Sequence, residues 1–125
     1  MSAHRNWLRF DLLRRRYALP AEGVAAVERE RPLLPVPGAP GGVLGVTERR
    51  GRVLTVLDCA TLLDDAPTER RRVLVILRSP LAHVALSIAG ELQLDELSEA
   101  EQIEGAVQRV DPLDLLARAA RNEPS

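Results

Sequence analysis

Residues 33–58 constrain the fold of this chain more than any other stretch. They open with a loop of prolines and glycines, LLPVPGAPGG, in which proline fixes φ and glycine permits conformations closed to other residues. Two apolar segments follow, residues 43–46 and 53–57, with Arg49, Arg50 and Gly51 between them. Apolar runs on either side of a glycine-containing turn predict a β-hairpin. The rest of the chain must therefore pack around a rigid loop and this hairpin.

The segment before the loop also predicts strands. Apolar and charged residues alternate over residues 7–13, and residues 17–19 resume an extended apolar segment, so the two predict a hairpin. One helical turn is expected over residues 21–26, followed by an edge strand over residues 27–31.

The segment after the hairpin predicts a second unit of similar kind. Asp58 is a candidate N-cap for a short helix over residues 59–63. The polar connector of residues 64–72 is the best boundary between the two halves of the chain. Beyond it, residues 73–77 resemble a buried strand, as do residues 53–57, which are apolar enough for burial on both faces.

Five further elements are predicted toward the C-terminus. Alternating patterns predict strands over residues 83–88 and 91–97, the second with Leu92, Leu94 and Leu97 as its apolar set. A capping box from Ser98 to Glu101 predicts a short helix over residues 99–103, and a short strand follows over residues 106–110. A terminal helix starts at Asp111-Pro112, and these residues form its expected apolar face: Leu113, Leu116, Ala117 and Ala120.

Composition and pattern together define the class of protein. About eight or nine short strands with few helices predict a mostly β protein of small barrels, and 125 residues suffice for one domain.

All 17 basic residues are arginine, and the net charge of −1 argues against a general nucleic-acid binder. The single cysteine fits a reducing compartment. No apolar run approaches the roughly 18 residues of a membrane span, so a cytoplasmic protein without membrane insertion is expected.

Residues with catalytic potential are few. His4 and His83 have no Cys, His or carboxylate neighbours at metal-ligand spacing and are interpreted as surface or structural histidines. Cys59 is interpreted as a buried structural thiol, with a lowered pKa at the start of a helix as the alternative. Asp64 and Asp65 are interpreted as solvated loop carboxylates. No catalytic residue, metal or cofactor is predicted, and an enzyme that uses Cys59 or His83 ranks third among the functional hypotheses.

The arginines fall into two groups. The runs at residues 14–16 and 70–72 lie at predicted connectors, where solvated charges are expected. The other group flanks the turn of the central hairpin: Arg49, Arg50 and Arg52. An arginine at this turn can offer its planar fork of donors to a carboxylate or to backbone carbonyls, within the fold or in a partner.

Three motifs occur in an order that is characteristic of one family. The sequence contains FDLLRRRYALP, then VAAV, then PVPGAPGGVLGVTERRGRVLTVLD. This order resembles the CheW-like domain of bacterial chemotaxis adaptors, whose pattern is a tyrosine-containing strand, V-x-x-V, a proline-flanked loop, G-x-x-N-x-R-G and an apolar strand ending in Asp. The corresponding residues are Gly45, Arg50, Gly51 and Asp58. The likeness covers residues 7 to about 116.

The resemblance implies a fold and a function. The fold would be two small SH3-like barrels of five strands around a shared core, in a single domain with subdomains at about residues 15–66 and at 7–14 plus 70–121. The function would be non-catalytic: the family couples chemoreceptors to the histidine kinase CheA. Expected partners are a chemoreceptor cytoplasmic tip and the regulatory domain of a CheA-type kinase. The residues that match the family's binding surface are Val24, Val27, Val43, Val46, Glu48, Arg50 and Gly51.

Two departures from the family pattern concern the hairpin. Glu48 replaces the motif's Asn, and Ala26 replaces the acidic residue that the family carries within V-x-x-V. Arg50 is therefore expected to lack its usual partner, with Glu28 or Glu48 as the possible substitute.

Two further departures concern the second subdomain. Residues 87–89 lack the expected strand-ending acid, and residues 105–116 are too short for the family's closing pair of strands. The second barrel is therefore expected to be truncated, and one of the two kinase contacts to be in question. The alternative function is an SH3-like nucleic-acid-binding module that uses the arginine clusters, against which the near-zero net charge and the scarcity of aromatic residues count.

Overall fold

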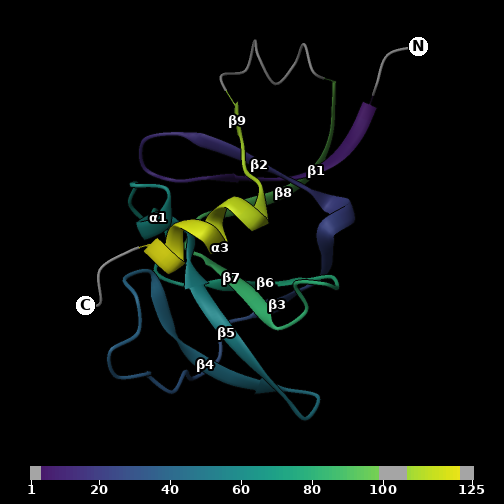
Figure 1. Cartoon of the computed structure of the whole chain (residues 1–125). Coiled ribbons are helices and arrows are strands. Elements are labelled where there is room, and N and C mark those ends of the chain that lie inside the picture. Colours follow the sequence, from purple (N-terminus) through teal and green to yellow (C-terminus); the bar gives the residue numbers. More distant parts are fainter. Residues whose placement is uncertain (1–3, 99–106, 122–125) are drawn as a thin grey trace.

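Two β-sheets make up most of the computed structural model, which describes residues 4–98 and 107–121 (Figure 1). The upper sheet in Figure 1 has the strand order β8 (Glu91–Ser98), β1 (His4–Asp11), β2 (Arg16–Pro20) and β9 (Val107–Arg109). The lower sheet has the order β3 (Val24–Arg29), β6 (Val73–Leu77), β7 (Val84–Ile88), β5 (Arg52–Asp58) and β4 (Val43–Arg49). The predicted mostly β class is confirmed.

The upper sheet is built on the predicted N-terminal hairpin. β1 and β2 pair antiparallel, with Phe10 opposite Tyr17 and their rings stacked at 5.3 Å. β8 pairs antiparallel with the other side of β1, and β9 pairs parallel with β2. Gly90 permits this arrangement because a Cβ there would lie 2.2 Å from the carbonyl oxygen of Asp11, so the chain can enter β8 beside β1 only without a side chain.

The lower sheet contains the hairpin that the sequence predicted. β4 and β5 pair antiparallel, β5 pairs parallel with β7, and β6 lies between β7 and β3. The helical turn predicted over residues 21–26 is wrong: a 3₁₀ helix, η1, covers only Ala21–Gly23, and Val24 already belongs to β3. The carbonyl of Gly23 accepts the N–H of Arg78 at 2.9 Å, so pairing with the chain at the end of β6 draws this segment into the sheet.

The sheets divide the chain differently from the expected subdomains. β6 and β7 were expected in the second subdomain, yet they pair with β3 and β5 of the first. In the described residues, β1, β8 and β9 of the expected second subdomain share their sheet with β2 of the first. The polar connector of residues 64–72 therefore links two parts of one sheet rather than two separate sheets.

A continuous apolar core lies between the two sheets. It combines residues of the upper sheet such as Phe10 and Leu19, residues of the lower sheet such as Leu57 and Leu86, and Leu115 from the terminal helix. A smaller cluster within the lower sheet consists of Leu54, Val56, Leu74, Ile76 and Ala85. Both clusters are dominated by aliphatic side chains, as the scarcity of aromatic residues predicts.

Burial departs from the predicted patterns in three strands. Val53 is 65% exposed, so β5 is not buried on both faces along its whole length. β7 was expected to alternate, but all five of its residues are buried, including the polar Ser87. Side chains on one face, such as Leu86, belong to the main core and Ala85 on the other face belongs to the smaller cluster, so both faces are covered. Leu94 was expected to be apolar core in β8, and it is 68% exposed.

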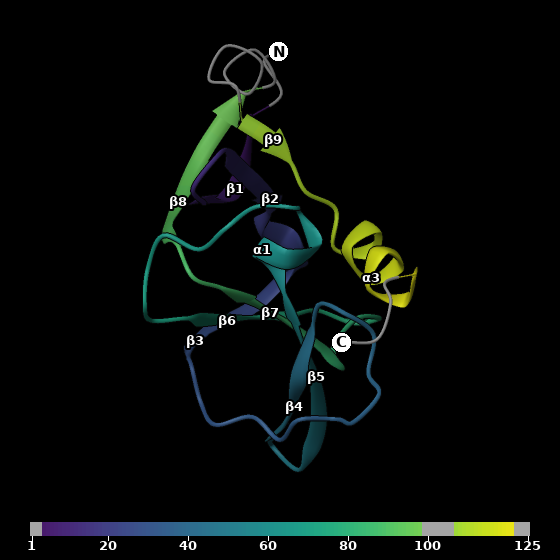
Figure 2. The ribbon, with the colours of Figure 1, turned by 90° about the vertical axis from the view of Figure 1, so that its left-hand side faces the viewer.

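Two helices complete the described part. α1 (Cys59–Leu62) follows Asp58, which occupies the N-cap position without a capping hydrogen bond from its side chain to the backbone. α3 (Pro112–Arg121) starts where the sequence predicted, but it buries Leu115 and Ala119, while Leu113 is 59% exposed. The guanidinium of Arg118 donates to the carbonyl oxygen of Leu62 at 3.2 Å and joins the two helices, which Figure 2 shows beside the sheets. The helix predicted over residues 99–103 lies outside the described residues.

Candidate partner-binding surface

The turn between β4 and β5 presents one arginine to solvent. Arg49 pairs with Arg52 across the strands, and Arg50 and Gly51 form a two-residue turn with φ of 52° and 78°. Positive φ at both central positions is the geometry of a type I′ hairpin turn. The carboxylate of Glu48 accepts the N–H of Gly51 at 2.9 Å and so stabilises the turn from within. Arg50 is therefore held at the outermost point of the hairpin, where it is exposed.

Gly45 fixes the path of the proline-rich loop against β4. Leu34 and Val46 exchange both of their backbone hydrogen bonds, at 2.8 and 2.9 Å, so the loop adds a short bridge to the edge of β4. A Cβ on Gly45 would lie 2.6 Å from the carbonyl oxygen of Leu34, and its φ is 153°. The glycine of the family motif is thus required by the close approach of two backbones.

A cluster of charged side chains joins the two edges of the lower sheet. Arg49, at the end of β4, donates from Nε and Nη2 to Oε2 of Glu28 in β3, at 3.0 and 2.9 Å. Arg31 donates to Oε1 of Glu28 at 2.5 Å and to the carbonyl of Glu48 at 3.1 Å. β3 and β4 are opposite edges in the strand order, so this pairing holds the sheet in a curled form.

This cluster is partly shielded from water and is electrostatically satisfied. The side chains of Arg49 and Glu28 are 17% and 26% exposed. The hydrogen bond from Arg49 is the main reason that the pKa of Glu28 lies below its ordinary value, and the same bond raises the pKa of Arg49. The pair is bidentate in the manner of arginine and carboxylate, which makes it directional as well as attractive.

The charged residues of the hairpin therefore have different partners from those that the sequence predicted. Glu28, expected as a substitute partner for Arg50, binds Arg49 instead. Glu48 binds the turn's own backbone. Within the described residues, Arg50 makes no hydrogen bond or ion pair, so it alone of these two neighbouring arginines is free to contact a partner. Sequence reasoning did not predict the pair of Arg49 with Glu28. Arg49 and Arg50 are adjacent and of the same residue type, so the sequence did not show that only Arg49 lies in the strand.

The four predicted valines differ in their surroundings. Val24 and Val43 are half-buried and pack against the main core. Val27 is 49% exposed on β3, and Val46 is half-buried on β4 beside the Leu34 bridge. Val27 and Val46 lie on β3 and β4, the two edges that the Glu28–Arg49 pair joins.

Two hollows lie on the β3 side of the molecule. An open hollow of about 450 Å³ is bordered by Ala25, Arg49, Arg78 and neighbouring residues of β6. A second hollow, of about 250 Å³ and mostly apolar, lies between η1, the turn after β6 and the start of α3. Its apolar lining includes Leu77, Pro80, Leu81, Pro112 and Leu113. A hollow of this size and character accommodates apolar side chains of a docked segment.

Asp58, the last residue of the family motif, has a structural environment. Its side chain is 13% exposed and accepts from Arg72 at 3.2 Å and from the hydroxyl of Thr61 at 2.8 Å. Arg72 also donates to the buried hydroxyl of Ser87 at 3.3 Å. The carboxylate thus ties the connector to the ends of β5 and β7 and does not face a partner.

The residues considered for catalysis lie in varied environments. Cys59 is fully buried, and burial raises the pKa of its thiol, so the alternative of a lowered pKa is wrong. His83 is exposed. Asp65, expected to be solvated, is half-buried and accepts the hydroxyl of Tyr17 at 2.7 Å. In residues 4–98 and 107–121, no group of His, Cys, Asp or Glu could hold a metal ion, and no helix is long and apolar enough to cross a membrane.

Two packed sheets around a shared core, with an exposed arginine at the tip of the β4–β5 hairpin, define the architecture of this β domain. The family model of the CheW-like domain matches residues 6–119, so the chain belongs to the CheW-like domain family. Its structure is similar to the crystal structure of the scaffolding protein TtCheW from Thermoanaerobacter tengcongensis, with a TM-score of 0.69 and 16% sequence identity over 81% of this chain and 67% of that chain. A comparison with curated proteins finds no match.

Proposed function

We propose that this chain is a non-catalytic adaptor of a chemosensory pathway, and that it couples a chemoreceptor to a CheA-type histidine kinase in the cytoplasm. Membership of the CheW-like domain family supports the scaffold role. The similarity to a protein described as a scaffolding protein agrees with it. No reaction is proposed, since Cys59 and His83 have no partners that would activate them among the described residues.

The environment of Arg50 carries this proposal. An exposed guanidinium at the tip of a rigid turn loses little conformational freedom of the backbone when a partner binds. Its neighbours Arg49 and Glu48 already have partners within the fold, so they position the turn rather than compete for the ligand. Arg50 can therefore bind a carboxylate or backbone carbonyls of a partner through its fork of donors.

The apolar hollow beside α3 supports binding of a helix as the second contact. It is bordered by an exposed leucine, Leu113, and by the half-buried Leu81. A receptor tip is expected to present an amphipathic helix, and a helix binds such a hollow through side chains spaced three or four residues apart. Four valines stay predictions for the partner-binding surface, although none of them lines this hollow: Val24, Val27, Val43 and Val46.

Binding of two purified partners in parallel tests the proposal. The wild-type chain, Arg50→Ala and Arg71→Ala would be titrated against a soluble receptor-tip fragment and against the regulatory domain of a CheA-type kinase. Arg50→Ala is expected to weaken binding about tenfold or more, as for loss of one charge-assisted hydrogen bond. Arg71→Ala removes an equally exposed arginine from the connector and is expected to have little effect.

The stability of the variants separates a binding role from a structural one. Arg50→Ala should keep the thermal midpoint of the wild type, whereas Arg49→Ala should lower it because Glu28 then loses its bidentate partner. Binding of neither partner by the wild-type chain would refute the proposed function. Unfolding of Arg50→Ala would show that Arg50 is a structural residue.

A further inference from the structure

The open hollow of about 450 Å³ beside β3 lies where the ends of β4 and β6 approach that strand. Ala25 belongs to β3, Arg49 is the last residue of β4, and Leu77 is the last residue of β6. The complete lining of this space, the rim hollow, is Ala25, Arg49, Ile76, Leu77, Arg78, Ser79 and Ala82. Two of these residues carry a positive charge and none carries a negative charge.

Arg52 is a third cation at this end of the lower sheet. It is the direct partner of Arg49 across the β4–β5 hairpin, so the two side chains start from the same face of the sheet. That face of β5 also carries Leu54, which shares the smaller apolar cluster with Ile76 of the rim hollow. Like charges directly opposite each other destabilise a strand pair. Arg49 is neutralised by Glu28, whereas the fold leaves the charge of Arg52 without an opposite charge.

The unpaired charges around the rim hollow are all positive. Arg52 and Arg78 are exposed, and none of the ion pairs among the described residues involves either of them. The carboxylates on this side of the molecule already have partners: Glu28 binds Arg49, Glu48 accepts the N–H of Gly51, Glu22 is paired with Arg5, and Asp111 accepts the N–H of Leu113. A partner can therefore supply the anions that folding does not supply to Arg52 and Arg78.

The floor of the rim hollow is apolar. Ile76 and Leu77 are each 2% exposed, and the small side chains of Ala25 and Ala82 leave space above them. A concave apolar surface with a few polar groups at its border accommodates an apolar side chain and orients the charged groups beside it. The ligand should therefore combine negative charge with an apolar group.

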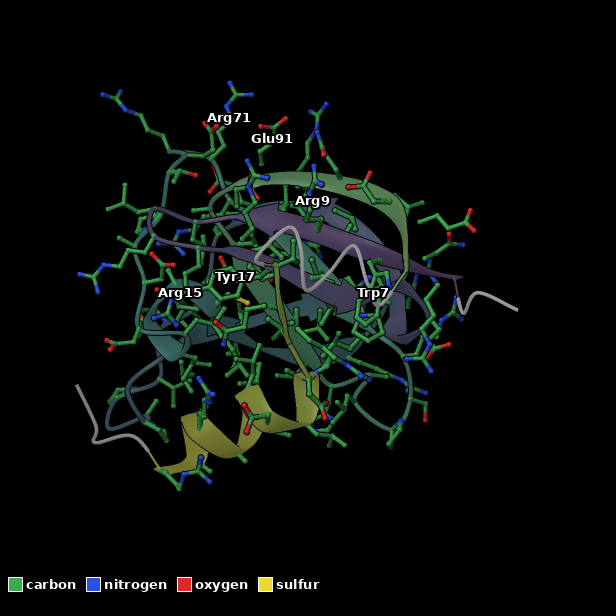
Figure 3. All side chains as sticks on the ribbon, turned by 90° about the horizontal axis from the view of Figure 1, so that it is seen from above. Trp7, Arg9, Arg15, Tyr17, Arg71 and Glu91 are labelled. Atoms are coloured by element: carbon green, nitrogen blue, oxygen red, sulfur yellow. The ribbon has the colours of Figure 1, made fainter. Side chains whose placement is uncertain are left out.

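A nucleic acid fits this surface less well than an acidic polypeptide. Single strands bind through bases that stack on aromatic side chains. The chain has three aromatic residues, Trp7, Phe10 and Tyr17, and all are at most 2% exposed. Figure 3 shows Trp7 and Tyr17 on the strands of the upper sheet. The rim hollow, in the lower sheet, thus offers charge and an apolar floor but no stacking platform.

We propose that the rim hollow binds an acidic segment of a partner protein. An apolar side chain of the segment enters the hollow, and flanking Asp or Glu carboxylates bind Arg52 and Arg78. Each guanidinium can hold a carboxylate through two parallel hydrogen bonds, and the positive field attracts the segment before contact. This site goes beyond the proposed coupling of receptor and kinase, because it is defined by the charge pattern of the segment.

Titration with synthetic peptides tests the proposal. A labelled peptide of sequence GSDELLEDSG would be added to the full chain, and binding would be followed by fluorescence anisotropy at several salt concentrations. GSKRLLKRSG reverses the charge, GSDESSEDSG removes the apolar pair, and a ten-nucleotide oligothymidylate represents a nucleic acid. Only GSDELLEDSG is expected to bind saturably, and its affinity should fall as the salt concentration rises.

Variants of the lining locate the binding site. Arg52→Ala and Arg78→Ala should each weaken binding several-fold, and the double variant about tenfold or more, as for loss of exposed ion pairs. Ala82→Phe should weaken binding to a similar extent, because the larger side chain fills the hollow. Arg50→Ala should bind the peptide nearly like the wild type, since Arg50 does not line the hollow.

Arg71→Ala is the matched control. Arg71 precedes β6 whereas Arg78 follows it, so the two exposed arginines lie beyond opposite ends of the strand. Figure 3 shows Arg71 beside Glu91 at the border of the upper sheet. Arg71→Ala should therefore bind the peptide like the wild type. Circular dichroism should show that the variants keep the wild-type fold, because the replaced side chains are exposed.

The outcomes separate this site from its alternatives. Absence of saturable binding, equal binding of GSDESSEDSG or of the oligothymidylate, or equal weakening by Arg71→Ala would overturn the proposal. A dimer of the wild type that Arg78→Ala abolishes would show that a second copy occupies the hollow and would overturn it as well. A chain that binds the peptide but neither the receptor tip nor the kinase domain would refute the proposed function and support this site.

Discussion

Two adjacent arginines of the same chemical type have opposite roles because they lie on either side of a strand end. Arg49 is the last residue of β4, and its side chain reaches Glu28 on the other edge of the sheet. Arg50 lies in the turn with a positive φ, and its side chain is exposed. The strand boundary thus separates a side chain that holds the sheet from one that is available to a partner.

Gly45 offers a test of the contact between the proline-rich loop and β4. Gly45→Ala should lower the free energy of unfolding by roughly 1–3 kcal/mol or more, because the new Cβ adopts an unfavourable φ and collides with the carbonyl of Leu34. Urea unfolding would measure the change. Gly23→Ala is the matched control, since a Cβ at Gly23 meets nothing within 4 Å. A similar loss in both variants would contradict this explanation.

Cys59 is expected to be unreactive in the folded protein. The thiol is fully buried in the main core, and burial raises its pKa, so almost no thiolate is present near neutral pH. A thiol reagent such as DTNB at pH 8 should label the chain slowly in buffer and rapidly in denaturant. Fast labelling of the folded chain would show that α1 opens readily and would revive the hypothesis of a reactive cysteine.

At the scale of elements, Asp65 connects the N-terminal hairpin to the segment after α1. Its carboxylate accepts the N–H of Arg14 at 2.9 Å and the hydroxyl of Tyr17 at 2.7 Å. The N–H of Leu13 donates to the carbonyl of Ala66 at 3.0 Å, so backbone and side chain act together. Burial disfavours the charge of Asp65, but these hydrogen bonds outweigh it and lower the pKa of the carboxyl.

Alkaline titration measures the strength of this connection. Burial and the hydrogen bond to Asp65 raise the pKa of Tyr17 to about 12. The folded state thus holds the phenolic proton more tightly than the unfolded state, whose pKa is about 10. The resulting stabilisation is complete below about pH 10 and is lost as the pH rises toward 12. Absorbance at 295 nm reports Tyr17 alone, because the chain has one tyrosine.

The control for this titration is Asp65→Asn. This substitution removes the negative charge that Tyr17 faces. The pH midpoint of the Tyr17 ionisation should therefore move down toward the ordinary pKa of tyrosine. An unchanged midpoint in Asp65→Asn would mean that burial alone sets the pKa of Tyr17. A wild-type midpoint near 10 would contradict the buried hydrogen bond itself.

The sequence predicts elements well where one physical cause dominates. Apolar runs bounded by turn residues predicted the β4–β5 hairpin and the strands β6 and β7, and Pro112 predicted the start of α3. Prediction failed where long-range contacts decide the outcome. Val24 joins β3 by pairing with Leu77, and β7 is buried on both faces because apolar clusters lie on each of them. The Glu28–Arg49 pair could not be predicted for the same reason, since it depends on the curl of a whole sheet.

At the scale of the molecule, the shared core makes the two sheets interdependent. One cluster contains Leu8 and Tyr17 from the upper sheet, Val75 and Leu86 from the lower sheet, and residues of both helices. Neither sheet keeps its apolar face covered without the other. The chain should therefore unfold as a single cooperative unit.

A core substitution in the lower sheet tests this interdependence. Leu86→Ala should cost about 2–5 kcal/mol, because Leu86 is fully buried. The fluorescence of Trp7, the single tryptophan, reports on the upper sheet, where the side chain is 2% exposed. The Trp7 transition in urea should shift to lower concentration together with the circular dichroism of the whole chain. A Trp7 transition that stays in place would show that the sheets unfold independently.

The parallel pairing of β2 with β9 also determines when folding can finish. Residues Arg16 to Ala18 pair with Val107 to Arg109, so strands from the two ends of the chain lie side by side. Contacts between residues so distant in sequence form slowly, because a long loop must close first. During synthesis, β2 leaves the ribosome long before β9 exists. One edge of the hairpin of β1 and β2 therefore stays unpaired until residues 107–109 have been translated.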